Sequence, residues 1–227
     1  MRFGPFKFPR LGKDSHRDDP YWDFFINTPP ADLANTITEM IRKAPEGNFF
    51  PTKAELHTPE ITSSHVKGMA RYLGADLVGI ASLASRNDVR DRRGDGLRPK
   101  ISPAPEGTAP FPTGGLSPSL PQDEGSEHYP FGVICAVRAD YDPRTSPGIG
   151  GQVPVQNGLF ITFVLTAWIR ELGFRATALP DPDAEKLAAA AGLGTLNSDG
   201  KLVTPRYGTR VHVANVIYTD LPLAPDS

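Results

Sequence analysis

The pattern of apolar and polar residues predicts two amphipathic helices in the first third of the chain. In both segments apolar residues recur three and four positions apart, which places them on one helix face. They are Leu33, Ile37, Met40 and Ile41 in residues 31–44, and Val66, Met69, Ala70 and Leu73 in residues 63–74. Pro30 marks the start of the first helix, Ser63 or Ser64 the N-cap of the second, and Gly74 its C-terminal cap.

Longer apolar runs predict buried elements in the centre of the chain. Residues 75–83 ("ADLVGIASL") and 129–140 ("YPFGVICAVRAD") are predicted to be strands. Residues 157–172 ("NGLFITFVLTAWIREL") are long enough for a helix, and Gly173 follows where a helix commonly ends. Because this segment is apolar nearly all round, we expect it at the centre of the fold.

The last forty residues combine a small-residue helix with two short strands. The helix begins near Asp183, a residue that can cap it, and ends at Gly192. Residues 201–204 and 211–219 are predicted to be strands separated by the turn "PRYGTR". Small residues and glycines let a ligand lie close to the backbone, so this segment is a candidate pocket wall.

Two other segments are predicted to lie outside the regular core. Residues 1–30 form an irregular N-terminal arm, and residues 85–128 form a Pro/Gly-rich excursion from a single domain at 31–227. A loop of such length is a lid, a subunit contact or an unstructured insertion. We expect the aromatic residues of the arm to pack on the domain's own core, with a partner or second subunit as the alternative; these are Phe6, Phe8, Tyr21, Trp22, Phe24 and Phe25.

Charge and cysteine content narrow the range of functions. Twenty-four basic and 26 acidic residues leave a formal net charge of -2, which disfavours nucleic acid and anionic membranes as partners and favours a small molecule or another protein. The sequence shows no secretory signal and no apolar run that spans a bilayer, so the cytoplasm is the expected compartment. Cys135, the single cysteine, excludes an intrachain disulfide and a four-cysteine cluster, and is predicted to be a buried apolar residue.

Residues 188–223 ("AAAAGLGTLNSDGKLVTPRYGTRVHVANVIYTDLPL") carry a resemblance to a known family. They resemble the segment of reductive dehalogenases and epoxyqueuosine reductases with the pattern A-x-x-A-G-L-G, L-I-T-P, Y-G-x-R-V-R and T-D-L-P-L. The similarity extends over residues 63–83 and 129–223. It implies an α/β fold, an α+β sandwich of the nitroreductase-like kind with a mixed sheet flanked by helices, which binds a corrinoid (cobalamin).

The resemblance implies site residues position by position. The corrinoid is expected to lie against Gly192, Leu193, Gly194, Asn197, Thr204, Pro205, Tyr207 and Gly208. Arg210 and His212 are expected to act on the substrate side, where His212 stands in place of the second arginine of the family's R-V-R. An imidazole can donate a hydrogen bond and titrate near neutral pH. No metal site made of side chains is predicted.

Two further departures limit what the resemblance implies. The family continues past T-D-L-P-L into a cysteine-rich segment, whereas this sequence stops at Ser227, so we expect no iron–sulfur cluster of its own and a separate electron-donor protein. Dehalogenases also have a tyrosine acid ahead of the apolar helix, and residues 151–168 contain no tyrosine. The proton donor is therefore missing or lies elsewhere.

Four functions remain open from the sequence. The first is a stand-alone corrinoid-binding domain that reduces a small organic substrate, and the second is a non-catalytic cobalamin carrier or redox-complex subunit. The third is an FMN protein of the nitroreductase-like kind, in which residues 85–128 could exchange across a homodimer; no basic phosphate cluster accompanies the glycines. The fourth is an interaction module that binds no cofactor.

Overall fold

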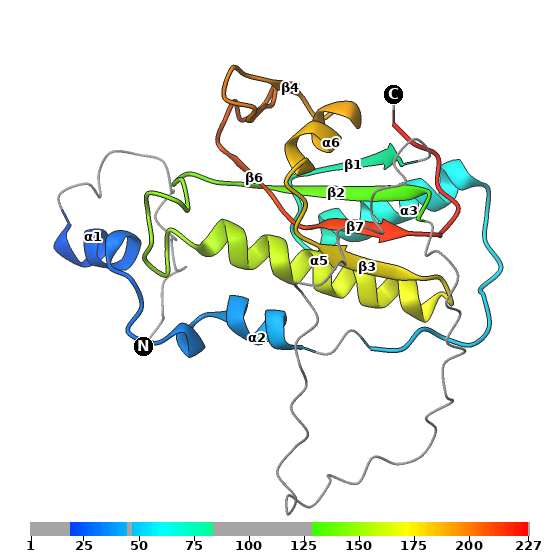
Figure 1. Ribbon diagram of the computed structural model, residues 1–227, viewed down its shortest axis with the longest axis horizontal. Coiled ribbons are helices and arrows are strands. Elements are labelled where there is room, and N and C mark those ends of the chain that lie inside the picture. The colour runs from blue at the N-terminus through cyan, green and yellow to red at the C-terminus, as the bar shows by residue number, and fades with distance from the viewer. Residues whose placement is uncertain (1–18, 45–46, 84–128, 227) are drawn as a thin grey trace, which may run out of the picture.

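A computed structural model describes residues 19–44, 47–83 and 129–226 (Figure 1). Its centre is a five-stranded sheet in the order β1-β2-β7-β3, with β6 also paired to β2. The strands are β1 (Leu77–Ser82), β2 (Phe131–Arg138), β3 (Ala176–Leu179), β6 (Val211–Val213) and β7 (Val216–Thr219). Every strand pair in the described residues is antiparallel, so the expectation of a mixed sheet is wrong for this part of the chain. The strand β3 was not predicted.

The segment predicted as one strand over 211–219 is two strands, β6 and β7. Both pair with β2, so that Ile217 lies opposite Val133 and His212 opposite Val137. The ladder is interrupted at Ala214, whose backbone N–H still donates to the carbonyl of Cys135 at 2.9 Å. This interruption separates β6 from β7, and both strands remain paired to β2, with His212 in the sheet at β6.

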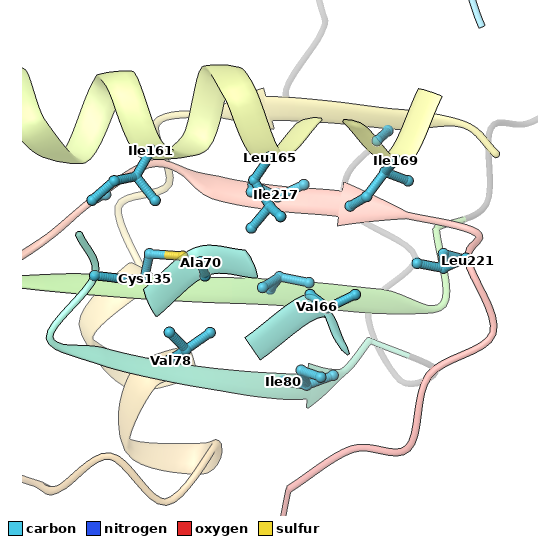
Figure 2. Close-up of a cluster of buried hydrophobic side chains, with 14 of the residues drawn as sticks. Val66, Ala70, Val78, Ile80, Cys135, Ile161, Leu165, Ile169, Ile217 and Leu221 are labelled. Atoms are coloured by element: carbon cyan, nitrogen blue, oxygen red, sulfur yellow. The ribbon is translucent and has the colours of Figure 1, made fainter. Parts of the chain in front are cut away.

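Helices cover both faces of the sheet. On one face α3 (Pro59–Tyr72) and α5 (Val153–Glu171) enclose the larger core, whose side chains alternate along β1 and β2 as a two-residue period requires. Figure 2 shows part of this core; its labelled members are Val66, Ala70, Val78, Ile80, Cys135, Ile161, Leu165, Ile169, Ile217 and Leu221. On the other face α6 (Ala184–Ala190) packs through Leu187 and Ala188. The expected strands at 75–83 and 129–140 and the central helix are confirmed.

The helix caps predicted from the sequence are confirmed in part. Gly74, Gly173 and Gly192 follow their helices with φ values of 109°, 81° and 71°, as C-terminal cap residues do. Asp183 occupies the N-cap position of α6 but makes no capping hydrogen bond, and its carboxylate instead pairs with Lys186 at 3.0 Å. The predicted start of the second helix is wrong, since α3 begins with a proline, which suits the first helical turn.

The predicted helix over 31–44 is divided. A 3-10 turn (Leu33–Asn35) is followed by α2 (Ile37–Lys43), and the carboxylate of Asp32 accepts from Ala34 N at 2.8 Å to cap the turn. Two residues of the predicted apolar face are exposed among the described residues, with Leu33 64% and Met40 67% accessible.

The N-terminal arm contains a helix, α1 (Pro20–Asn27), where irregular structure was expected. Its carbonyls at Phe25 and Ile26 accept hydrogen bonds from Gly150 N at 3.0 Å and Gly148 N at 2.7 Å. A Cβ at Gly148 would lie 2.4 Å from the backbone of Ile26. The glycine-rich loop at residues 148–151 therefore packs directly against α1.

Some aromatic residues of the arm contact the rest of the protein, and others are exposed. The indole of Trp22 donates to the hydroxyl of Tyr141 at 2.9 Å. Tyr21 and Phe24 are 85% and 65% exposed, so core packing was wrong for these two. Phe6, Phe8 and residues 85–128 lie outside the described residues, and the predictions for them stay predictions.

Candidate functional site

The predicted corrinoid-binding residues lie on one continuous segment that begins where α6 ends. It forms a small hairpin of β4 (Thr195–Leu196) and β5 (Leu202–Val203) on the α6 side of the sheet (Figure 1). The turn of this hairpin is closed by Asn197, whose Oδ1 accepts from Asp199 N at 3.0 Å and Lys201 N at 2.9 Å. The amide oxygen of Asn197 therefore shapes the hairpin itself.

The glycines that precede the hairpin are required by packing. Gly192 ends α6, and the N–H of Leu193 donates to the carbonyl of Ala188 at 3.0 Å. A Cβ at Gly194 would lie 2.2 Å from the carbonyl oxygen of Val203, so only glycine lets the two backbones approach. These residues set the position of the hairpin relative to α6.

A second turn, residues 204–208, follows β5. The backbones of Thr204 and Gly208 exchange two hydrogen bonds of 2.9 Å, and Thr204 Oγ1 donates to Gly208 O and accepts from Tyr207 N. The hydroxyl of Tyr207 donates to Asp76 Oδ1 at 3.2 Å, which ties this turn to the start of β1. Pro205 is exposed at the tip of the turn.

The two turns leave part of their backbone open to a ligand. An added Cβ at Gly200 or Gly208 would meet no described atom within 4 Å, and Leu196 is 38% exposed beside them. Most side-chain acceptors here are occupied within the turns. A ligand that lies on this surface, as the predicted corrinoid would, contacts open backbone and the exposed side chain of Leu196.

Arg210 and His212 lie at β6, at the opposite end of the same segment. The side chain of Arg210 is 61% exposed, and its Nη1 lies 3.9 Å from Asp140 Oδ1, which also binds Arg138 at 2.8 Å. His212 is half-buried, and burial lowers the pKa of its imidazole while Asp142 acts in the opposite direction. The structure thus separates an exposed cation from a partly buried titratable ring.

A charged cluster that the sequence did not reveal lies around Asp142. This carboxylate accepts from Arg144 Nη2 at 2.9 Å and from Lys201 Nζ at 3.2 Å, and the hydrogen bonds from Arg144 lower its pKa. Nearby in α6, Glu185 accepts from Leu202 N at 2.9 Å, and burial raises the pKa of its carboxyl. The only sequence signal for this cluster is the charged run "RADYDPR" at residues 138–144. The participation of Lys201, 59 positions away, has no local signal.

Comparison with known proteins gives the class. The chain is 31% identical over 219 residues to a tetrachloroethene reductive dehalogenase of Dehalobacter restrictus, a match that covers 85% of this chain and 37% of the relative. A solved reductive dehalogenase described with a B12-dependent mechanism has the same fold, with a TM-score of 0.55, 17% identity, and coverage of 84% of this chain and 26% of that one. An epoxyqueuosine reductase from Streptococcus thermophilus is more distant, with 17% identity, a TM-score of 0.41, and coverage of 72% of this chain and 47% of that one.

The chain is therefore a reductive-dehalogenase-like domain. It spans little more than a third of the length of the curated relative that it matches. No family model matches it. Within the described residues there is neither a helix that could cross a bilayer nor a group of three or more His, Cys, Asp or Glu side chains arranged for a metal ion.

Proposed function

We propose that this chain is the corrinoid-binding part of a reductive-dehalogenase-type enzyme and takes part in the reduction of a small organic substrate. The observation that carries the proposal is the match to a tetrachloroethene reductive dehalogenase along 85% of the chain. The fold shared with a reductive dehalogenase, at a TM-score of 0.55, supports it.

The corrinoid would be held by the two turns next to α6. Gly200 and Gly208 leave open backbone, and Leu196 offers an exposed apolar contact. When bound, a corrinoid supplies a cobalt centre that accepts electrons and reduces the substrate. The protein's part is to orient that group, and the hydrogen bond from Tyr207 to Asp76 keeps the turn at 204–208 in place.

Arg210 and His212 would act on the substrate, Arg210 by orienting it and His212 by supplying a proton. The exposed guanidinium of Arg210 can orient an electronegative leaving group, because it makes only a long contact of 3.9 Å with Asp140. His212 can supply a proton. Residues 153–168 of α5 contain no tyrosine that could take this role.

Electrons would come from a donor outside these 227 residues. The single cysteine of these 227 residues, Cys135, is fully buried in β2, and burial raises the pKa of its thiol to about 12. Thiolates are the ligands of four-cysteine iron–sulfur clusters, so these 227 residues cannot build one alone. We infer that a low-potential iron–sulfur centre outside these residues is the donor.

A non-catalytic corrinoid carrier is the second candidate, favoured by the lack of a tyrosine in the first turns of α5. The enzyme and the carrier are distinguished by whether substrate is converted. Purified protein reconstituted with hydroxocobalamin and a strong one-electron reductant should convert a chlorinated alkene or phenol, with chloride release as the measure. Corrinoid binding without chloride release would favour the carrier, and binding of FMN in place of cobalamin would contradict both.

A further inference from the structure

The central helix α5 exposes an apolar stripe to solvent. Its opposite side packs on the sheet and is buried, as Ile161 and Leu165 show. The exposed positions within residues 153–169 are Val153, Asn157, Phe160, Phe163 and Ala167. They recur three or four residues apart, which places them on one helix face. Val153, Phe160 and Phe163 are 41%, 43% and 40% exposed. Exposed helix faces usually carry charges, whereas residues 153–169 contain no ionisable side chain, so this stripe has the composition of a face that packs against another surface.

The neighbouring helix α2 adds exposed apolar residues beside α5. It packs against α5 and runs beside it in Figure 1. Leu33, Ile37 and Met40 are spaced four and three positions apart on the 3-10 turn and α2, and they are 64%, 39% and 67% exposed. These three residues and the three exposed large apolar residues of α5 are together called the α2–α5 face.

The size of the α2–α5 face matches one side of a dimer interface. At about 200 Å² for each large side chain when fully exposed, the exposed parts of its apolar residues amount to roughly 600 Å². A standard interface buries about 800 Å² on each partner, and about 65% of a homodimer interface is apolar. Each partner of such a dimer therefore contributes roughly 500 Å² of apolar surface.

The charge distribution suits contact between two identical copies. In a two-fold interface each patch meets itself, so a charged stripe would bring like charges together. The exposed positions of α5 between residues 153 and 169 are uncharged. On α2, Glu39 and Lys43 pair with each other at 2.9 Å, so these two charges are balanced within one copy. Arg42, next to the last residue of α2, is the remaining charge of that helix.

We propose that the α2–α5 face is the contact surface of a two-fold homodimer, in which α5 lies antiparallel to α5 of the second copy. An antiparallel arrangement opposes the two helix dipoles. With the axis next to Phe160, the midpoint of the stripe, Val153 lies opposite the partner's Ala167. A larger side chain then faces a small one at both ends of the contact, and the phenylalanines meet at its centre, where interface residues contribute most.

The first test is the oligomeric state of the 227-residue chain without cofactor, measured by analytical ultracentrifugation. Wild type should be a dimer at about 100 µM, because interfaces of this size have micromolar or tighter affinity. Phe160→Asp places two carboxylates at the centre and should weaken dimerisation at least about thirtyfold. Leu196→Asp is the matched control, because Leu196 is 38% exposed in the hairpin on the α6 side of the sheet, and it should dimerise like wild type. A monomeric wild type, or equal dissociation constants for wild type and Phe160→Asp, would overturn the proposal.

Asn157→Lys decides the question if Phe160→Asp fails to fold. This position is exposed and already polar, so the substitution removes no apolar contact within one copy. In the dimer it places a charge opposite the partner's Phe163 and should weaken association at least about tenfold. A wild-type dissociation constant in the folded Asn157→Lys protein would be incompatible with this contact surface.

Cysteine cross-linking tests the antiparallel arrangement. Cys135 is the single native cysteine and is buried, so an introduced surface thiol reacts alone. In Phe160→Cys the two thiols lie next to the axis and should form an intermolecular disulfide on mild oxidation. In Asn157→Cys they lie about 9 Å apart along the helices, beyond the distance of about 7 Å that a disulfide spans between Cα atoms, and should link much more slowly. Equal rates for the two variants, or linking in neither, would overturn the arrangement.

The dimer does not depend on the proposed function, because α5 and the candidate corrinoid turns lie on opposite faces of the sheet. Phe160→Asp should lose the dimer and keep its affinity for hydroxocobalamin, and Leu196→Asp should do the reverse. A wild-type dimer that binds no corrinoid would leave this proposal standing and overturn the proposed function. Corrinoid binding by a wild-type monomer would do the opposite.

Discussion

The hydroxyl of Tyr207 donates a hydrogen bond to Asp76 Oδ1 at 3.2 Å, joining two residues 131 positions apart. The other carboxylate oxygen of Asp76 accepts from Arg138 N at 2.7 Å. One carboxylate thus connects the candidate corrinoid turn, the start of β1 and the end of β2. The turn is held in place by the sheet as well as by its own hydrogen bonds.

Loss of this connection should weaken the turn. Tyr207→Phe removes one hydrogen bond to a charged group in a partly buried place, and we expect the free energy of unfolding to fall by about 1–2 kcal/mol. Urea denaturation measures it. Tyr21→Phe is the control, since that side chain is 85% exposed and should change stability by less than about 0.5 kcal/mol. Equal stability of the two variants would show that the Asp76 contact contributes nothing.

Docking of α1 should depend on the absence of a side chain at Gly148. In Gly148→Ala the new Cβ would meet the backbone of Ile26 at 2.4 Å, and we expect a loss of about 1–3 kcal/mol together with faster proteolysis near residue 20. Gly68→Ala in α3 is the matched control, because its Cβ meets no described atom within 4 Å. This control should gain up to about 1 kcal/mol of stability. Proteolysis of Gly148→Ala at the wild-type rate would contradict the docking.

Glu185 should give a pH dependence of opposite sign to that of an ordinary salt-bridged acid. Burial raises the pKa of its carboxyl above 4.5, so between 4.5 and the folded-state pKa the folded protein binds more protons than the unfolded one. Its contribution to stability is therefore present below 4.5 and is lost as the pH rises through the folded-state pKa. Chemical denaturation of Glu185→Gln should show a gain relative to wild type at pH 7 that disappears near pH 4. A constant difference across this range would contradict the assignment.

The pKa of His212 also has a consequence for stability. Burial lowers it below 6.5, so the unfolded chain binds more protons than the folded one between the folded-state pKa and 6.5. The contribution is complete above 6.5 and is lost as the pH falls through the folded-state pKa. His212→Gln should therefore flatten the stability profile in the pH window just below 6.5. A profile with the wild-type slope in this window would mean that His212 is as accessible in the folded state as in the unfolded one.

Cys135 should be inert in the folded protein. It is fully buried, and burial raises the pKa of the thiol to about 12, so the reactive thiolate is scarce at pH 8. Reaction with a thiol reagent should proceed only through unfolding and accelerate with added urea. Full labelling within minutes in buffer without urea would contradict the burial.

The parts of the fold that were predictable are those with long, uninterrupted apolar patterns. Val133, Cys135 and Val137 face one core and Ile134 faces the other, so β2 is apolar throughout and was recognised as a buried strand. The strand β3 was missed because "ATAL" is short and contains a single β-branched residue. The antiparallel order depends on pairs such as Val133 with Ile217, which no local pattern specifies.

For the candidate site too, local patterns could be read from the sequence and long-range contacts could not. Residues 192–208 could be proposed as a site because they are consecutive in sequence and match a pattern, and that assignment stays a prediction. The structure adds that Asn197 and Thr204 use their side chains to shape turns. Asp142 and Glu185 were missed because their partners, Lys201 and Leu202, lie 59 and 17 positions away. Long-range contacts of this kind become visible only in the folded chain.

The most direct test of the central claim is equilibrium binding of hydroxocobalamin, followed by visible absorption and gel filtration under reducing conditions. We predict one corrinoid per chain, with affinity at least tenfold weaker in Leu196→Asp, which places a charge beside the two turns. Tyr72→Asp on α3 is 84% exposed and covers the other face of the sheet, so this control should bind like wild type. No comigrating corrinoid, or equal binding by the two variants, would contradict the account.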